Sequence, residues 1–337
     1  MRELAPSGEP APTAGAASPA GPTGPGADRA YPDARRGTVY GLAAYGLWGV
    51  FPLFFALLRP AGPVEILAHR IAWSLVVCLV ALALLRQLGW LAALVRGPRQ
   101  LAAVTAAGVI IACNWTLYTF AVLTGHVTEA ALGYFLNPLV TVALGVVVLR
   151  ERLRPGQWVA VGIGLVAAAY LTVDYGEPPW ISLALAFSFA TYGLLKKRVG
   201  DSLSAWQSLT GETLTLLPVA LVLLVLLQLS GDLTFATEGP VHALLLASCG
   251  VVTAVPLLLF AGAARRVPLV TVGLLQFITP VLQLLCGVLL LGESMAASRW
   301  VGFALVWVAL AVLSVDSLRA AGRARRLARA AEAASAA

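Results

Sequence analysis

The side chains of this chain that could do chemistry are polar residues set within long apolar runs. Asn114 and Tyr118 are four positions apart, and Tyr134 and Asn137 are three apart. On helices the first pair shares a face and the second pair nearly does. Such amide and hydroxyl groups can hydrogen-bond a small organic ligand. They can equally join neighbouring helices, at about 1 kcal/mol for each bond, and the sequence leaves both roles open.

The reactive residue types argue against an enzyme. The three histidines, His69, His126 and His242, lie on different segments and lack metal-ligand spacing. The sequence has no nucleophile elbow and no phosphate-binding loop. The four cysteines all fall within apolar segments and imply no disulfide framework. We therefore expect no catalytic residue, no metal and no other cofactor.

The apolar runs that carry these residues are long enough to cross a bilayer, which needs about 20 apolar residues per helix. Hydrophobic residues make up 59% of the chain and charged residues 12%, about half the charge of an average soluble domain. We predict an all-α polytopic membrane protein with ten transmembrane helices. They are expected at residues 38–58, 64–85, 101–123, 128–149, 156–173, 180–196, 205–228, 241–263, 268–291 and 299–317.

The two halves of the chain repeat one pattern at a fixed offset. Four residues recur 142 positions further on with every internal spacing kept: Pro138, Gly145, Glu151 and Trp158 return as Pro280, Gly287, Glu293 and Trp300. Agreement of uncommon residues at one offset indicates an internal duplication. Because each copy holds five spans, an odd number, the copies must be inverted relative to each other, as in secondary transporters. The predicted repeats are residues 37–175 and 176–317.

Positive charge alternates between the loops on the two sides of the membrane. One side holds the arginines and lysines of both terminal segments and of the loops after the second, fourth, sixth and eighth predicted spans. The loops on the other side hold only Arg59 and Arg299. This bias predicts that both termini lie on the cytoplasmic side of a bacterial-type plasma membrane. The net charge of +7 is thereby explained without a nucleic-acid partner. Residues 1–36 are expected to be a disordered segment, and residues 318–337 a basic cytoplasmic tail that forms either a lipid-surface helix or a solvated anchor.

Several segments resemble a known family. They are YGLWGVFPLFF, EILAHRIAWS, NWTLYTFAV, TGHVTEAALGYFLNP, ERLRPGQW, SFATYGLLKK and TAVPLLLFAGAARR, between about residues 38 and 316. Together they look like the RarD branch of the EamA family, in the drug/metabolite transporter superfamily. The resemblance implies a ten-helix permease with two inverted five-helix repeats, a central cavity and peripheral fifth and tenth helices. It gives no substrate.

Polar residues near the midplane of the predicted spans are the candidate substrate-binding residues. Depth follows from the helical rise of about 1.5 Å per residue, and transporters bind their substrates near this level. The candidates are Asn114, Asn137, Thr253, Gln276 and Thr279, with Tyr118 and Tyr134 on the same helices and Trp48 and Tyr192 as an aromatic wall. The alternative for the aromatic positions is close helix packing beside glycine.

Prolines and ionisable residues within the spans are the candidate gating residues. Pro138 and Pro280 take symmetric midplane positions, as hinges or as purely architectural kinks. Arg70 and Glu212 are also 142 positions apart, but they lie about 9 Å from opposite membrane faces, which is too far apart to pair.

Each of these two charged residues therefore needs a partner at its own depth. The expected partners are Glu129 for Arg70, with His69 as a further member, and Lys196 or Lys197 for Glu212. The two pairs would close the outer and the inner mouth of a cavity. The alternative is that Arg70 snorkels outward and Glu212 is neutral.

These features predict a secondary-active permease that moves a small organic metabolite or drug-like solute by alternating access. The expected partners are this solute and the lipid bilayer, with a homodimer left open. Without a nucleotide-binding motif, uphill transport would draw on an ion or solute gradient. The remaining alternative is a membrane protein without transport activity, such as a sensor, a scaffold or an intramembrane enzyme.

Overall fold

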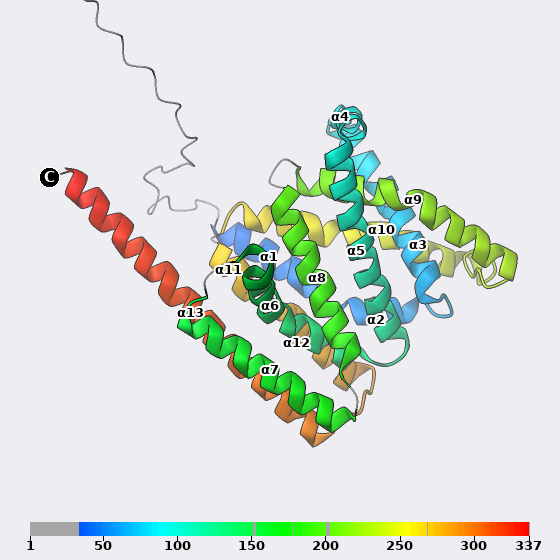
Figure 1. The fold of residues 1–337 in the computed structure, drawn as a ribbon. Coiled ribbons are helices and arrows are strands. Elements are labelled where there is room, and N and C mark those ends of the chain that lie inside the picture. The colour runs from blue at the N-terminus through cyan, green and yellow to red at the C-terminus, as the bar shows by residue number, and fades with distance from the viewer. Residues whose placement is uncertain (1–33, 151–152, 177, 200–202, 268, 337) are drawn as a thin grey trace, which may run out of the picture.

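The computed structural model describes residues 34–336 except 151–152, 177, 200–202 and 268. All regular elements of these described residues are helices (Figure 1). In chain order they are α1 (Ala34–Gly49), α2 (Phe51–Leu57), α3 (Pro63–Leu84), α4 (Trp90–Arg96), α5 (Pro98–Leu123), α6 (Val127–Leu149), α7 (Pro155–Tyr175), α8 (Trp180–Val199), α9 (Ala205–Ser230), α10 (Gly239–Ala264), α11 (Leu269–Leu275), α12 (Ile278–Leu285), the π-helix η1 (Cys286–Leu290) and α13 (Ala297–Ala336).

The long helices have the length and composition of membrane spans. Eight are long and apolar enough to cross a bilayer, and nine if α1 and α2, which meet at 42°, form one span. The apolar part of α8, Trp180–Lys196, is shorter. Their outward faces carry exposed aliphatic side chains such as Leu84, Val173 and Leu229, which is the surface that lipid requires. The expected all-helical, multi-span protein is confirmed.

The flanks of the predicted bundle differ from the expected boundaries. The segment expected to be disordered, 1–36, lies outside the described residues up to position 33, and its last three residues already belong to α1. At the other end, α13 continues without a break through the basic tail and reaches Ala336, a length of 40 residues. The tail is therefore helical.

The two symmetric prolines act differently on their helices. Pro138 lies inside α6, which remains one helix over 23 residues. Pro280, by contrast, lies in the first turn of α12, directly after a break at Gln276 and Phe277 that separates α11 from α12. Proline tolerates a first turn because the N–H that it lacks has no partner there. Only the second copy of the repeat is thus interrupted at its proline.

α7 and α13 lie side by side along one flank of the bundle (Figure 1). They are the helices of the fifth and tenth predicted spans. A buried apolar cluster joins them to α6 and α12, with Phe135 of α6 and Phe303 of α13 in edge-to-face contact. The remaining long helices surround the residues described in the next subsection.

Two glycines 142 positions apart allow close approach of helices in equivalent places. A Cβ on Gly108 of α5 would lie 3.2 Å from the carbonyl oxygen of Glu212 on α9. A Cβ on Gly250 of α10 would lie 2.4 Å from the carbonyl oxygen of Trp73 on α3. Small residues at such crossings let backbones pack directly, which is a common device of membrane helices.

Candidate functional site

Arg70 is a buried arginine enclosed by aromatic rings. It is the eighth residue of α3, and only 5% of it is exposed. Its Nε donates a hydrogen bond of 2.9 Å to Oγ1 of Thr253 on α10. Its guanidinium carbon lies 3.9 Å from the ring centre of Trp115 on α5, and 5.5 and 5.8 Å from those of Phe55 and Phe51 on α2. The cation thus contacts three aromatic faces.

Arg70 does not pair with Glu129, the partner expected from the sequence. No ion pair joins Arg70 to a carboxylate of the described residues. The Arg70 side chain points to Thr253, near the middle of α10. Glu129, in the first turn of α6, instead lines a recess of about 160 Å³ together with Glu293 and Arg299. The low exposure of Arg70 also rules out the alternative that it snorkels into water.

Three other predicted polar residues form a connected group that reaches Phe55, one of the aromatic partners of Arg70. Nδ2 of Asn114 donates to the carbonyl oxygen of Leu185 at 3.2 Å and to Oγ of Ser188 at 2.9 Å, both on α8. Its Oδ1 accepts from Oη of Tyr134 at 3.3 Å. The ring of Tyr118 packs against Phe55 and Tyr134, and its buried hydroxyl has no hydrogen-bond partner in the described part of the chain. We call Arg70, Thr253, Trp115, Phe51, Phe55 and Tyr118 the Arg70 cluster.

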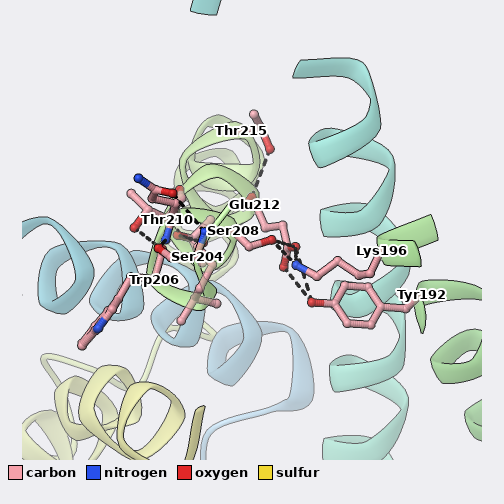
Figure 2. A network of polar contacts seen from close by, with 11 residues as sticks. Tyr192, Lys196, Ser204, Trp206, Ser208, Thr210, Glu212 and Thr215 are labelled. Carbon is pink, nitrogen blue, oxygen red and sulfur yellow. Dashed lines mark hydrogen bonds and ion pairs between the residues drawn. The ribbon is translucent and has the colours of Figure 1, made fainter. Parts of the chain in front are cut away.

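A second buried cluster forms around Glu212 between α8 and α9. Glu212 is 2% exposed, and its Oε1 lies 2.7 Å from Nζ of Lys196. Oγ of Ser208 donates to the same oxygen at 3.0 Å and also contacts Lys196 Nζ, while Oη of Tyr192 donates to Oε2 at 3.2 Å. Figure 2 shows these side chains converging from the two helices. We call Glu212, Lys196, Ser208 and Tyr192 the Glu212 cluster.

The start of α9 fixes the position of Glu212. Oγ of Ser204 accepts from the backbone N–H of Gln207, and Oε1 of Gln207 accepts from the backbone N–H of Ser204. This capping box sets the first turn of the helix, as seen beside the cluster in Figure 2. Ser208 and Glu212 follow four residues apart on one face. Of the two lysines expected for Glu212, Lys196 is the one found, and the side chain of Lys197 lies outside the described part of the chain.

A series of aromatic rings connects the two clusters. Tyr134 of α6 lies next to Tyr118 of the Arg70 cluster, with ring centres 5.7 Å apart. Phe189 of α8 follows at 6.0 Å from Tyr134, and Tyr192 of the Glu212 cluster follows at 6.2 Å from Phe189. This series, the aromatic path, extends from Phe55 to Tyr192.

The other predicted site residues make contacts outside the Arg70 and Glu212 clusters. Oγ1 of Thr279 donates to the carbonyl oxygen of Tyr45 on α1, and Trp48 packs against Tyr45 and Phe260. Asn137 accepts a hydrogen bond of 3.5 Å from Thr141 on its own helix. Gln276 is half-buried at the break before α12. The predicted polar layer is thus divided. Thr253 bonds Arg70, and Asn114, Tyr134 and Tyr118 form a connected group that reaches the Arg70 cluster at Phe55.

His69 contacts a different network from Arg70. Its ring stacks on Phe235 with centres 4.6 Å apart, and Nε2 lies 3.9 Å from Oε1 of Glu65. The buried carboxylate of Glu65 accepts from the backbone N–H groups of Thr234 and Phe235 and from the Thr234 hydroxyl. Glu65 therefore holds the loop between α9 and α10. Sequence reasoning missed this role, although an acidic residue in the first turn of a span was a visible signal.

The aromatic partners of Arg70 were also missed. Trp115 directly follows Asn114 in the sequence, but nothing in the sequence shows that it faces α3. Phe51 and Phe55 lie in a run of aromatic residues that reads as ordinary membrane-helix composition. Their contact with Arg70 depends on the bend between α1 and α2, which the sequence did not predict.

Comparison with known proteins places the chain among bacterial transporters. A family model described as "EamA-like transporter family" matches residues 35–173 and 179–315. Protein RarD of Streptomyces exfoliatus is 54% identical over 86% of this chain and 92% of its own. Protein RarD of Escherichia coli is 39% identical (84% and 95%), and an uncharacterized transporter of Pseudomonas aeruginosa is 43% identical (86% and 96%).

One solved crystal structure has a similar fold. It superposes with a TM-score of 0.55 and covers 82% of this chain and 96% of its own, at 19% sequence identity. At that identity the similarity concerns the fold alone.

Proposed function

The chain belongs to the EamA-like transporter family, and from this premise we propose that it is a secondary-active permease that moves a small organic solute by alternating access. The resemblance to the RarD branch is confirmed by its relatives. The observation that carries the proposal is the pair of buried polar clusters inside an apolar helix bundle. Ionisable residues at membrane depth are costly and generally serve a function.

The proposed architecture is ten spans in two inverted repeats, at residues 37–175 and 176–317. Each of the ten predicted ranges contains a helix, and the family model matches each half of the chain separately. The equivalent close contacts of Gly108 and Gly250 support the same pairing of helices across the two copies. Inverted repeats provide two related half-structures that can rock against a site between them.

We assign the Glu212 cluster to the inner gate. Its ion pair joins α8 to α9, so opening at this level must separate Lys196 from Glu212. At the opposite mouth, the Glu293 carboxylate accepts hydrogen bonds of 2.5 and 2.8 Å from the backbone N–H groups of Val127 and Thr128. A carboxylate at the start of α6 also interacts favourably with the helix dipole. Releasing this contact would free α6 from the segment between η1 and α13 at the outer mouth.

The break before Pro280 is the proposed hinge. At Phe277 and Thr279 the backbone hydrogen bonds shorten to three-residue spacing, and Pro280 has no N–H to donate, so α11 and α12 would change their mutual angle here. Pro138, inside the continuous α6, marks the corresponding position in the other copy.

The proposed orientation, with both termini cytoplasmic, is tested by cysteine labelling in intact cells. Single cysteines would replace the exposed Pro178 and Ala296, which are expected outside, and the exposed Gln87, which is expected inside. The background lacks the four native cysteines. An impermeant maleimide should label the first two positions and not the third. Labelling of Pro178→Cys without Ala296→Cys would contradict the inverted repeats.

Transport itself is tested in proteoliposomes. Labelled metabolites would be screened with and without a pH gradient, and protein-free liposomes would serve as the control. We expect saturable uptake of at least one solute class that the unlabelled solute inhibits. Uptake that never exceeds the protein-free rate would contradict the proposal.

A further inference from the structure

Arg70 is a buried cation that has no counter-charge among the residues that the structure describes. A guanidinium remains protonated in proteins, so its charge must be compensated wherever it is buried. The other two charged side chains that are equally buried have strong partners: Glu212 has Lys196, and Glu65 has two backbone N–H groups and a hydroxyl. Arg70 has one neutral hydrogen bond and three rings.

Arg70 stacks on an aromatic ring, and this leaves the N–H donors in the plane of its guanidinium free to bind an acceptor. Trp115 covers a face of the guanidinium, at 3.9 Å, and a stacked face carries no N–H group. Nε–H is used by Thr253. The four N–H groups on the two Nη atoms form no hydrogen bond with the described residues. In-plane donors of this kind match the two oxygens of a carboxylate.

A second donor, the Tyr118 hydroxyl, belongs to a ring that shares Phe55 with Arg70. The rings of Tyr118 and the Arg70 guanidinium both contact Phe55, at 5.9 and 5.5 Å. The Tyr118 hydroxyl is buried and has no partner among the described residues. A buried hydroxyl without a partner is destabilising. The Arg70 Nη atoms and the Tyr118 hydroxyl have no acceptor among the described residues, and both side chains neighbour Phe55, which favours an acceptor that comes from outside the protein.

We propose that the Arg70 cluster binds the carboxylate of a small organic anion, which makes organic anions the substrate class of the permease. The carboxylate accepts from the Nη atoms of Arg70 and from the Tyr118 hydroxyl. The apolar part of the anion lies along the aromatic path, against Tyr134 and Phe189. This inference rests on the proposed function, because it names the solute class that the permease carries.

Ligand-induced stabilisation of the purified protein tests the proposal. The probes are benzoate, hexanoate and pyruvate, each compared with its neutral amide and with sodium chloride at the same ionic strength. Binding to the folded state alone raises the melting midpoint, by an amount that grows with the logarithm of ligand concentration over Kd once the site is saturated. At least one carboxylate should raise the midpoint in a saturable manner, and its amide and chloride should not.

Variants assign the effect to this cluster. Arg70→Gln should weaken apparent carboxylate affinity at least tenfold, and Tyr118→Phe about threefold to tenfold. Because Arg70→Gln removes an uncompensated charge, its ligand-free melting midpoint should equal or exceed that of the parent protein. The matched control is Arg266→Gln: Arg266 also stacks on an aromatic ring, that of Tyr40, but lies beyond the end of α10. This control should bind the carboxylate as the parent does.

Three results would overturn the inference. The first is equal stabilisation by carboxylate and amide, or by chloride. The second is a carboxylate effect that persists in Arg70→Gln, and the third is the absence of any effect across the panel. Flux in proteoliposomes separates this inference from the proposed function: saturable flux of a neutral solute that is unchanged in Arg70→Gln keeps the permease and rejects the anion site. Carboxylate binding without flux keeps the site and rejects the permease.

Discussion

The two members of the Lys196–Glu212 ion pair should contribute unequally to stability. The Glu212 side chain is 3% exposed, whereas the Lys196 side chain is 32% exposed and lies near the end of α8. Lys196→Met leaves a buried carboxylate, while Glu212→Gln leaves a lysine that can extend its amine towards the aqueous side.

The size of this difference follows from the contacts. Breaking a buried ion pair costs about 3–5 kcal/mol, but Ser208 and Tyr192 still donate to Glu212 and offset about 1 kcal/mol. We therefore expect Lys196→Met to cost about 2–4 kcal/mol. Glu212→Gln should cost about 1 kcal/mol, because its amide oxygen can still accept from Ser208. The double variant should cost less than the sum by about 1–2 kcal/mol.

The assay is equilibrium unfolding in mixed detergent micelles, titrated with a denaturing detergent. Arg96→Met, at the exposed end of α4, is the matched control for loss of a positive charge, and it should change stability by less than about 0.5 kcal/mol. Equal costs for the two single variants, or costs that add to within about 0.5 kcal/mol, would refute the reasoning.

Three further variants test other contacts, each by the same unfolding assay. Glu293→Ala removes the carboxylate at the start of α6 and should cost about 0.5–2 kcal/mol; no loss would mean that the contact contributes nothing. Gly250→Ala should cost about 1–3 kcal/mol, since its Cβ would lie 2.4 Å from the Trp73 carbonyl oxygen, whereas Gly193→Ala, with nothing within 4 Å, should cost nothing. Asn114→Ala breaks both hydrogen bonds from α5 to α8 and should cost about 1–2 kcal/mol together with reduced transport; unchanged stability would contradict its joining role.

One contact of the site, between Lys196 and Glu212, could be anticipated from the sequence. Apolar run lengths placed the helices, and counting residues along them placed Lys196 at the level of Glu212, where the structure pairs them. Depth alone did not predict which way a side chain points. Arg70 turns towards Thr253 and Trp115, although Glu129 had been the expected partner.

The reason is the uniform composition of membrane helices. A soluble helix marks its inward face by an apolar stripe, but a helix in lipid is apolar on every side, so its rotation is not marked. The unequal outcome at the two prolines shows the same limit. Pro138 and Pro280 occupy equivalent sequence positions, yet only the second follows a break, because the packing around each helix decides whether the chain stays helical.

Exchange flux in proteoliposomes tests the central claim, transport by alternating access, most directly. Vesicles containing the protein would be loaded with the unlabelled solute found by the uptake screen and then diluted into a trace of the labelled solute. A permease with one site that faces each side in turn should show faster labelled entry and a transient accumulation above equilibrium, which empty vesicles lack. Labelled entry that is independent of the internal solute would contradict alternating access.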